Sequence, residues 1–184
     1  VLEAEGRLKN NVFELTIKQT VPPTPDMADK QPMMIPVKIG LLNRNGEAVA
    51  FDYQGKRAAE TVLLLTEAEQ TFPLEGVTEA VVPSLLRGFS APVHLNYPYS
   101  DDDLLLLLAH DSDAFTRWEA AQTLYRRAVA ANLAALSDGV ELSKHGKLLA
   151  AVEKVISDDL LDNAFKALLL GVPSEAELWD GAEN

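Results

Sequence analysis

The chain has 184 residues, of which 47% are hydrophobic and 24% charged, so it can bury one good core or two small ones. Its net charge of −12 disfavours a nucleic-acid or anionic-membrane surface, because both kinds of partner require clustered Lys and Arg. The absence of cysteine excludes disulfides, thiol catalysis and cysteine-type zinc sites, and it fits a reducing compartment.

Alternation of apolar and polar residues predicts β-strands near the beginning of the chain. In VFELTIKQ (residues 12–19), Phe13, Leu15 and Ile17 alternate with polar side chains, as in a half-buried strand. The segment IPVKIGLL (residues 35–42) alternates in the same way. A proline-rich segment lies between them (residues 21–32). It predicts a long crossing between two sheets, because proline lacks the amide donor that a strand ladder needs.

The dipeptide Asn45-Gly46 follows the second of these strands and predicts a tight hairpin, because both residues tolerate positive φ. The return strand of this hairpin is predicted at EAVAFDY (residues 47–53). About seven short strands separated by turns are typical of an antiparallel, Ig-like β-sandwich. The remaining strand candidates are residues 61–65, 70–74, 81–89 and 92–97.

Apolar residues at helical spacing predict an all-α segment from residue 100 onward. Gly139 and Gly171 mark expected helix ends, and Ser174 with Glu177 has the spacing of a capping box that starts one more short helix. Short turns favour antiparallel packing of the helices, as in a superhelical repeat. The residues at helical spacing are Phe115, Trp118, Ala121, Tyr125, Ala128, Leu148, Val152, Val155, Leu161, Ala164, Phe165 and Leu168.

The change from strands to helices coincides with a change in charge. Residues 1–99 have a net charge of −3, whereas residues 100–184 have a net charge of −9. We therefore predict an α+β protein with its two parts in series. Residues 1–99 form a β-sandwich domain, and residues 100–184 form an all-α, antiparallel helical segment.

The stretch SDDDLLLLLAHDSD (residues 100–113) raises the question of a metal site, because three aspartates precede His110 and Asp111. Helical geometry opposes such a site. On one helix, Asp103 and His110 lie about 10 Å apart along the axis, whereas the ligands of one ion sit within about 2.0–2.6 Å of it. Only Asp113 has ligand spacing from His110, and a helix break is expected between them.

A capping interpretation of the same stretch needs no special geometry. Ser100 is predicted to cap a helix whose first turn contains Asp101 to Asp103, where negative charge meets the positive end of the helix dipole. His110 then lies in the last turn, where positive charge is favoured. Ser112 is predicted to cap the next helix, with Asp113 in its first turn. We prefer this interpretation to the metal site.

The other histidines give no stronger indication of a metal centre. His94 alternates with apolar neighbours and is expected on the outer face of a sheet, and His145 lies at a lysine-flanked helix start. A zinc ion shared by His94, His110 and His145 remains an alternative.

Motifs for other chemistry are missing from the sequence. There is no Gly-x-Ser-x-Gly nucleophile motif and no glycine-rich phosphate loop. Arg126 and Arg127 suit a carboxylate but are expected to be solvated, and Glu67 and Glu69 are expected at the surface. We therefore assign no catalytic, cofactor-binding or metal-binding residue to this chain.

Several segments resemble the bacterial aminopeptidase N family of zinc metallopeptidases, also called alanyl aminopeptidases. They are EAEGRLKNNVFELTIKQTVPPTP with KQPMMIPVKIGLLNRNGE, then LTEAEQTF, PSLLRGFSAPVHLNY, DAFTRWEAAQTL and VPSEAELWD. Their order and spacing also fit the family, and together they cover essentially the whole chain. The resemblance implies the β-sandwich domain of such an enzyme followed by the beginning of its larger C-terminal helical domain.

The family's zinc motif, His-Glu-x-x-His with a downstream Glu, does not occur in this sequence. The resemblance therefore implies a non-catalytic structural fragment of a cytoplasmic aminopeptidase N. Zinc and the peptide substrate would belong to the full-length enzyme, in which zinc-activated water attacks the first peptide bond. The fragment would space and position the helical domain over the active site. Its partners would be the catalytic domain and the rest of the helical domain.

Three further expectations concern partners and termini. A free-standing module that binds a protein partner through a sheet edge or a helix face is the alternative function. An interrupted helical domain should expose apolar side chains near the last helices and tend to self-associate. The final residues, Gly181-Ala182-Glu183-Asn184, resemble the family's substrate-amine motif Gly-x-Met-Glu-Asn without its Met, but they follow a helical run, and we assign them no role.

Overall fold

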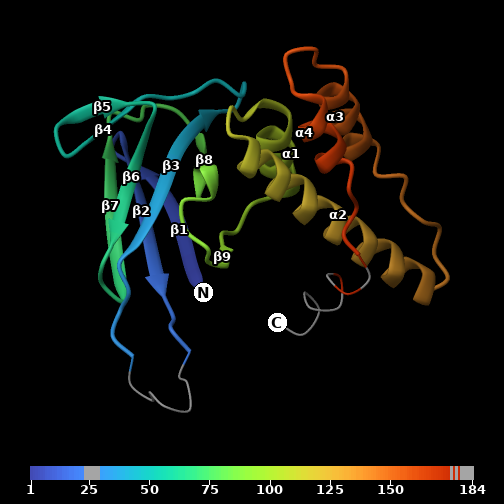
Figure 1. The fold of residues 1–184 in the computed structure, drawn as a ribbon, viewed down its shortest axis with the longest axis horizontal. Coiled ribbons are helices and arrows are strands. Elements are labelled where there is room, and N and C mark those ends of the chain that lie inside the picture. The colour runs from blue at the N-terminus through green and yellow to red at the C-terminus, as the bar shows by residue number, and fades with distance from the viewer. Residues whose placement is uncertain (23–29, 175, 177, 179–184) are drawn as a thin grey trace. The chain divides into compact units, whose positions relative to one another are not determined.

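The computed structural model describes residues 1–22, 30–174, 176 and 178. It divides the chain into two compact units, residues 1–99 and residues 100–184 (Figure 1). The first unit consists of β-strands and the second of α-helices. None of the described helices meets the length and hydropathy needed to cross a membrane.

Two sheets build the first unit. Over the described residues, one sheet has the strand order β5-β4-β7-β2-β1-β9 and the other has the order β6-β3-β8. All neighbouring strands are antiparallel except β1 and β9, which are parallel. The strands are β1 (Leu2–Lys9), β2 (Val12–Gln19), β3 (Ile35–Asn43), β4 (Phe51–Tyr53), β5 (Lys56–Ala58), β6 (Glu60–Leu65), β7 (Glu69–Glu75), β8 (Val81–Leu85) and β9 (Leu95–Asn96).

The predicted alternation places the core of this unit. In β2, the side chains of Phe13, Leu15 and Ile17 are buried, whereas their polar neighbours are largely exposed. In β3, Val37 and Ile39 are fully buried. The connection from β2 to β3 joins the two sheets, as the proline-rich segment predicts, although residues 23–29 of that segment lie outside the described part. The Ig-like, sandwich-type architecture predicted from the sequence is confirmed.

Strand β1 is absent from the sequence prediction. It pairs with β2 over its whole length. Only Leu2 and Ala4 of β1 are buried apolar side chains, so its alternation is weak. Gly6 continues the pattern without a side chain, because a Cβ atom there would meet the ring of Phe13 and the hydroxyl group of Tyr97.

Residues 47–53 were predicted to return alongside β3 as a hairpin partner, and this pairing was wrong. The tight turn forms, with the amide of Asn43 donating to the carbonyl of Glu47 at 2.9 Å. The returning chain then meets β3 only at the Leu42–Ala48 bridge before it leaves for the other sheet. There β4 pairs with β7 and forms a second hairpin with β5. The turn of that hairpin is Gln54-Gly55, in which both residues have positive φ.

The last two strand candidates are shorter than predicted. Strand β8 ends at Leu85 and is followed by a 3₁₀ turn, Arg87–Phe89, whereas β9 comprises two residues. Tyr99 closes the unit, because its hydroxyl group donates to the carbonyl of Pro83 in β8 at 2.7 Å.

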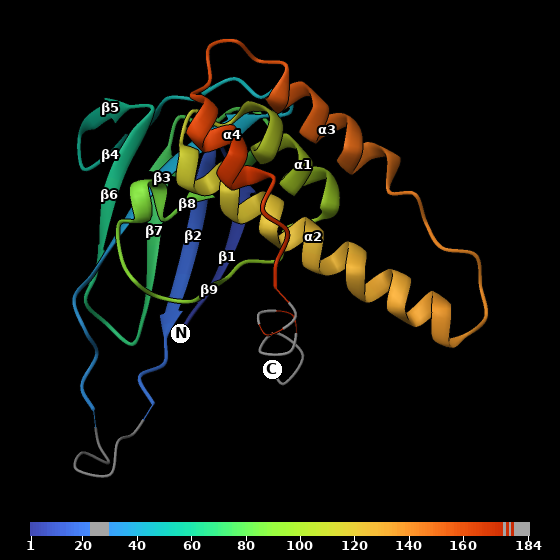
Figure 2. The same ribbon diagram turned by 45° about the vertical axis from the view of Figure 1, so that its right-hand side comes forward.

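Four helices form the described part of the second unit. Helix α1 packs against α2 and α3, and α4 packs against α2. Figure 2 shows α2 extending well past α1. The helices are α1 (Asp101–His110), α2 (Ala114–Ser137), α3 (Gly146–Ile156) and α4 (Asn163–Leu169). The buried apolar side chains of this unit are Leu104, Leu107, Leu108, Ala120, Ala121, Leu124, Val152, Val155 and Leu169.

Capping residues define the helix starts. Ser100 and Asp103 form the predicted first-turn cap as a full capping box, in which each side chain accepts a backbone N–H. The predicted Ser112 cap was wrong by one residue. Asp113 caps α2, because its carboxylate accepts from the backbone N–H of Thr116 at 2.9 Å.

The helix ends also follow the sequence. Gly139 lies just after the end of α2 with a φ of 67°, the left-handed conformation that glycine tolerates best. Gly171 follows the end of α4 as predicted. The buried side of α4 differs from the prediction, because Leu169 is buried and Leu168 is exposed. Glu177 of the predicted capping box and the final residues 181–184 lie outside the described residues, whereas the carbonyl of Ser174 accepts the N–H of Leu178 at 3.1 Å.

Candidate functional site

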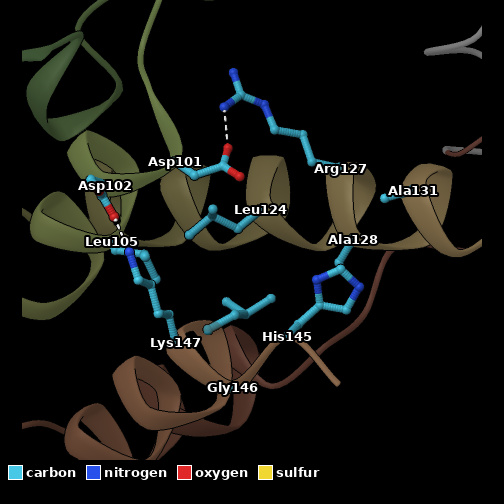
Figure 3. A pocket seen from close by; sticks show the side chains of 11 residues that line it. Asp101, Asp102, Leu105, Leu124, Arg127, Ala128, Ala131, His145, Gly146 and Lys147 are labelled. Atoms are coloured by element: carbon cyan, nitrogen blue, oxygen red, sulfur yellow. Dashed lines mark hydrogen bonds and ion pairs between the residues drawn. The ribbon is translucent and has the colours of Figure 1, made fainter. Parts of the chain in front are cut away.

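The three aspartates at the start of α1 are each engaged by a neighbour, and Figure 3 shows the pairs of Asp101 and Asp102. The carboxylate of Asp101 contacts the guanidinium group of Arg127 in α2 at 2.6 Å. The carboxylate of Asp102 contacts the ammonium group of Lys147 in α3 at 2.9 Å and raises the pKa of that lysine. Asp103 accepts the backbone N–H of Ser100. These acids therefore form exposed ion pairs with two other helices and complete the cap of α1.

Helices α1, α2 and α3 line an open hollow beside these ion pairs (Figure 3). His145 points into it from the residue before α3, where the backbone has a φ of 47°. Among the described residues, the Nε2 atom of His145 is buried and has no hydrogen-bond partner. The hollow is lined by Asp101, Asp102, Leu105, Leu124, Arg127, Ala128, Ala131, His145, Gly146, Lys147 and Leu148. Its two carboxylates face two cations, so it presents no uncompensated charge to a ligand.

His110 lies at the opposite end of α1, in its last turn as predicted. Its Nε2 atom is 3.0 Å from the ammonium nitrogen of Lys154 in α3. Burial lowers the pKa of His110, and the positive charges of Lys154 and Arg117 lower it further. The environment therefore favours the neutral imidazole, which can accept a hydrogen bond from Lys154.

The side chain of Arg117 is the most deeply buried basic group in the helical unit's described part, and sequence reasoning did not single it out. It is 7% exposed, and its Nε atom donates to the carbonyl of Leu108 near the end of α1 at 2.9 Å. Burial lowers the pKa of Arg117, whereas the negative charges of Asp158 and Asp111 raise it. Asp111 is itself 1% exposed. Arg117 therefore joins α2 to the end of α1 through this hydrogen bond, and the negative charge of Asp158 after α3 stabilises its positive charge.

The structure does not bring the predicted metal candidates together. Within the described residues, no group of three or more His, Asp or Glu side chains has an arrangement suited to a metal ion. Asp101 and Asp102 form ion pairs with Arg127 and Lys147. His110 contacts Lys154 at the other end of the helix. His94 is exposed in the first unit. Within the described part of α1, Asp101 and Asp102 are therefore engaged separately from His110.

The other charged candidates lie at the surface. Glu67 and Glu69 are exposed, as predicted. Arg126 and Arg127 were expected to be solvated, but each forms an ion pair. Arg126 contacts Glu119 at 3.4 Å, and Arg127 contacts Asp101. Both pairs retain substantial solvent exposure, so their contribution to stability is small.

Exposed apolar side chains are frequent in the helical unit, as predicted for its last helices. They lie on the second half of α2, on the connection to α3, and on α3, α4 and the segments that flank α4. They are Leu133, Leu136, Val140, Leu142, Leu149, Ile156, Leu160, Leu168, Leu170 and Val172. Self-association through these side chains stays a prediction.

The class that this architecture defines is an Ig-like sheet unit followed by a helical-repeat unit. Residues 2–98 match the family model described as a domain of unknown function (DUF3458) with an Ig-like fold. Residues 101–184 match the model DUF3458_C, which is described as ARM repeats. The chain therefore belongs to the DUF3458 family of aminopeptidase N homologues.

The relatives agree with the resemblance seen in the sequence. Aminopeptidase N of Escherichia coli is 40% identical over 171 residues, which are 91% of this chain and 20% of that protein. Aminopeptidase N of Haemophilus influenzae is 34% identical over 92% of this chain and 19% of its own length. The crystal structure of Legionella pneumophila aminopeptidase A is similar with a TM-score of 0.73 and 28% identity, covering 98% of this chain and 19% of that one. The chain thus spans about a fifth of each of these proteins.

Proposed function

We propose that this chain is a non-catalytic structural region of a zinc-dependent aminopeptidase N. One observation carries the proposal. The chain is 40% identical to aminopeptidase N of Escherichia coli over 91% of its own length, but it covers only 20% of that protein. The sequence has no His-Glu-x-x-His motif, and the described residues do not fit a metal site. Zinc and the general base are therefore assigned to another part of a longer polypeptide.

The role proposed for this region is to space and position the helical domain over the active site, which would limit access to small or unfolded peptides. Two compact units that meet at one chain connection, Tyr99-Ser100, suit such a role. The partners are then the catalytic domain and the remaining helices of the same polypeptide. We also propose a cytoplasmic location, which the cysteine-free composition supports.

An insertion at the connection tests the spacing role. In the longer polypeptide, six Gly and Ser residues between Tyr99 and Ser100 should loosen the helical cap. The measured quantity is the ratio of kcat/KM for a short peptide to kcat/KM for a folded protein with a free amino terminus. We expect this ratio to fall about tenfold, because a loose cap no longer excludes the folded substrate. The same insertion between Gln54 and Gly55, at an exposed hairpin turn, is the control. An unchanged ratio in the Tyr99-Ser100 variant would contradict the spacing role.

A free-standing binding module is the second candidate, and one observation favours it. Strand β6 is an edge strand, and its side chains Val62 and Leu64 are exposed and apolar. An apolar edge of this kind can accept a strand from another protein. The reading frame separates the two candidates. A start codon directly before Val1 and a stop codon directly after Asn184 would favour the module, whereas an open frame on both sides would favour the region of a longer enzyme.

A further inference from the structure

One face of α2 is covered over its first half and exposed over its second half. Gln122, Tyr125, Val129, Leu133 and Leu136 follow each other at intervals of three or four residues, so they lie on one side of the helix. The first two positions contact the end of α4. The amide of Gln122 donates to the carbonyl of Gly171 at 2.8 Å, and the hydroxyl group of Tyr125 donates to the carbonyl of Leu169 at 3.2 Å.

The remaining three positions continue this face as an apolar stripe, which we define as Val129, Leu133 and Leu136. Val129 is half-buried, whereas Leu133 is 61% exposed and Leu136 is 66% exposed. Two leucines that extend an existing helix contact into solvent are typical of a packing surface whose partner is a further helix.

The connection from α2 to α3 does not cover the stripe. It lies against a different side of α2, because both groups of the Asn132 amide bond to the backbone of Ser143, at 2.9 and 3.3 Å. Ala128 and Ala131, which share that side with Asn132, line the hollow near His145. At 100° per residue, this side is turned by about 100° from the stripe. The described part of the chain therefore leaves the stripe open.

We propose that the stripe binds an amphipathic helix from the continuation of the same polypeptide. This inference rests on the proposed function, because it requires a polypeptide longer than this chain. Three observations support a helix of the same polypeptide as the occupant. The helical unit matches a family of ARM repeats, in which each repeat packs on its neighbours. The relatives are about five times as long as this chain. The stripe also continues the face on which α4 already lies.

The test compares one pair of substitutions in two proteins. Leu133→Lys with Leu136→Lys should leave the 184-residue chain unchanged, because both side chains are exposed there and lysine suits the end of a helix. In the longer product of the same reading frame, limited proteolysis of the helical domain should become about tenfold faster, because the lysines would have to be buried in a helix contact. Leu160→Lys is the control, since Leu160 is 95% exposed and lies off the stripe.

Each alternative outcome has a separate meaning. Unchanged proteolysis in the longer protein would overturn the proposal while leaving the proposed function intact. A loss of stability already in the 184-residue chain would overturn it as well, because the leucines would then pack within this chain. Sedimentation showing that the double substitution splits a dimer of the longer protein would assign the stripe to a second copy instead. A reading frame that ends at residue 184 would remove the proposed function itself.

Discussion

Replacing Arg117 with methionine should cost about 1–3 kcal/mol of unfolding free energy in the helical unit, the loss expected when a buried hydrogen-bond donor is removed and its acceptor stays buried. Methionine retains much of the apolar volume but leaves Asp111, which is 1% exposed, without the positive charge of Arg117. It also removes the donor to the carbonyl of Leu108 at the end of α1. Urea unfolding followed by the helical circular dichroism signal measures the loss.

Two matched variants identify the cause of the Arg117 effect. Arg126→Met changes the same residue type on an exposed side of the same helix and should cost less than about 1 kcal/mol. Asp111→Asn combined with Arg117→Met should cost less than the two single changes added together, because the buried negative charge that Arg117 stabilises is then removed as well. A cost below about 1 kcal/mol for Arg117→Met would show that the buried guanidinium group does not hold the α1–α2 corner together.

Replacing Gln19 with alanine should cost about 2–4 kcal/mol in the sheet unit, because one buried side chain satisfies three backbone groups. Gln19 is 7% exposed. Its amide nitrogen donates to the carbonyls of Met33 and Glu67, both at 2.9 Å, and its amide oxygen accepts the N–H of Met33 at 2.8 Å. Alanine would leave these groups without their partner. Thermal unfolding followed by a probe of the sheet unit measures the change.

Gln70→Ala is the control for the Gln19 prediction. Gln70 is half-buried and accepts a single hydrogen bond, from the N–H of Thr66 at 3.1 Å, so its removal should cost about 1 kcal/mol or less. Gln19→Glu retains the acceptor for Met33 and removes both donors, so its cost should lie at or above that of alanine near neutral pH. If Gln19→Ala and Gln70→Ala lowered the unfolding free energy by the same small amount, the buried amide of Gln19 would not be what holds the β2–β3 connection in place.

The sequence predicted the elements whose side chains alternate strongly or have clear end signals. Strand β2 has three large apolar residues at period two, and helix α1 has Ser100 with acids behind it, so both were found. Strand β1 was missed because Gly6 replaces a side chain that the ring of Phe13 would exclude. The pairing of β4 was missed because a turn signal fixes the local bend but not the sheet that the returning strand joins.

The candidate site was predictable only in its local part. Capping by Ser100 depends on residues within one turn, so the sequence showed it directly. The ion pairs of Asp101 and Asp102 reach residues 26 and 45 positions away, and the buried Arg117 of α2 bonds to the end of α1. No spacing rule reveals contacts of this range, because they follow from helix packing rather than from local periodicity.

A peptidase assay tests the central claim most directly. The 184-residue chain is incubated with a short peptide that has a free amino-terminal alanine, with and without added zinc, beside the longer product of the same reading frame. We expect metal-dependent release of alanine by the longer protein and none above the buffer rate by the 184-residue chain. Metal-dependent release by the 184-residue chain by itself would contradict the assignment of a structural role.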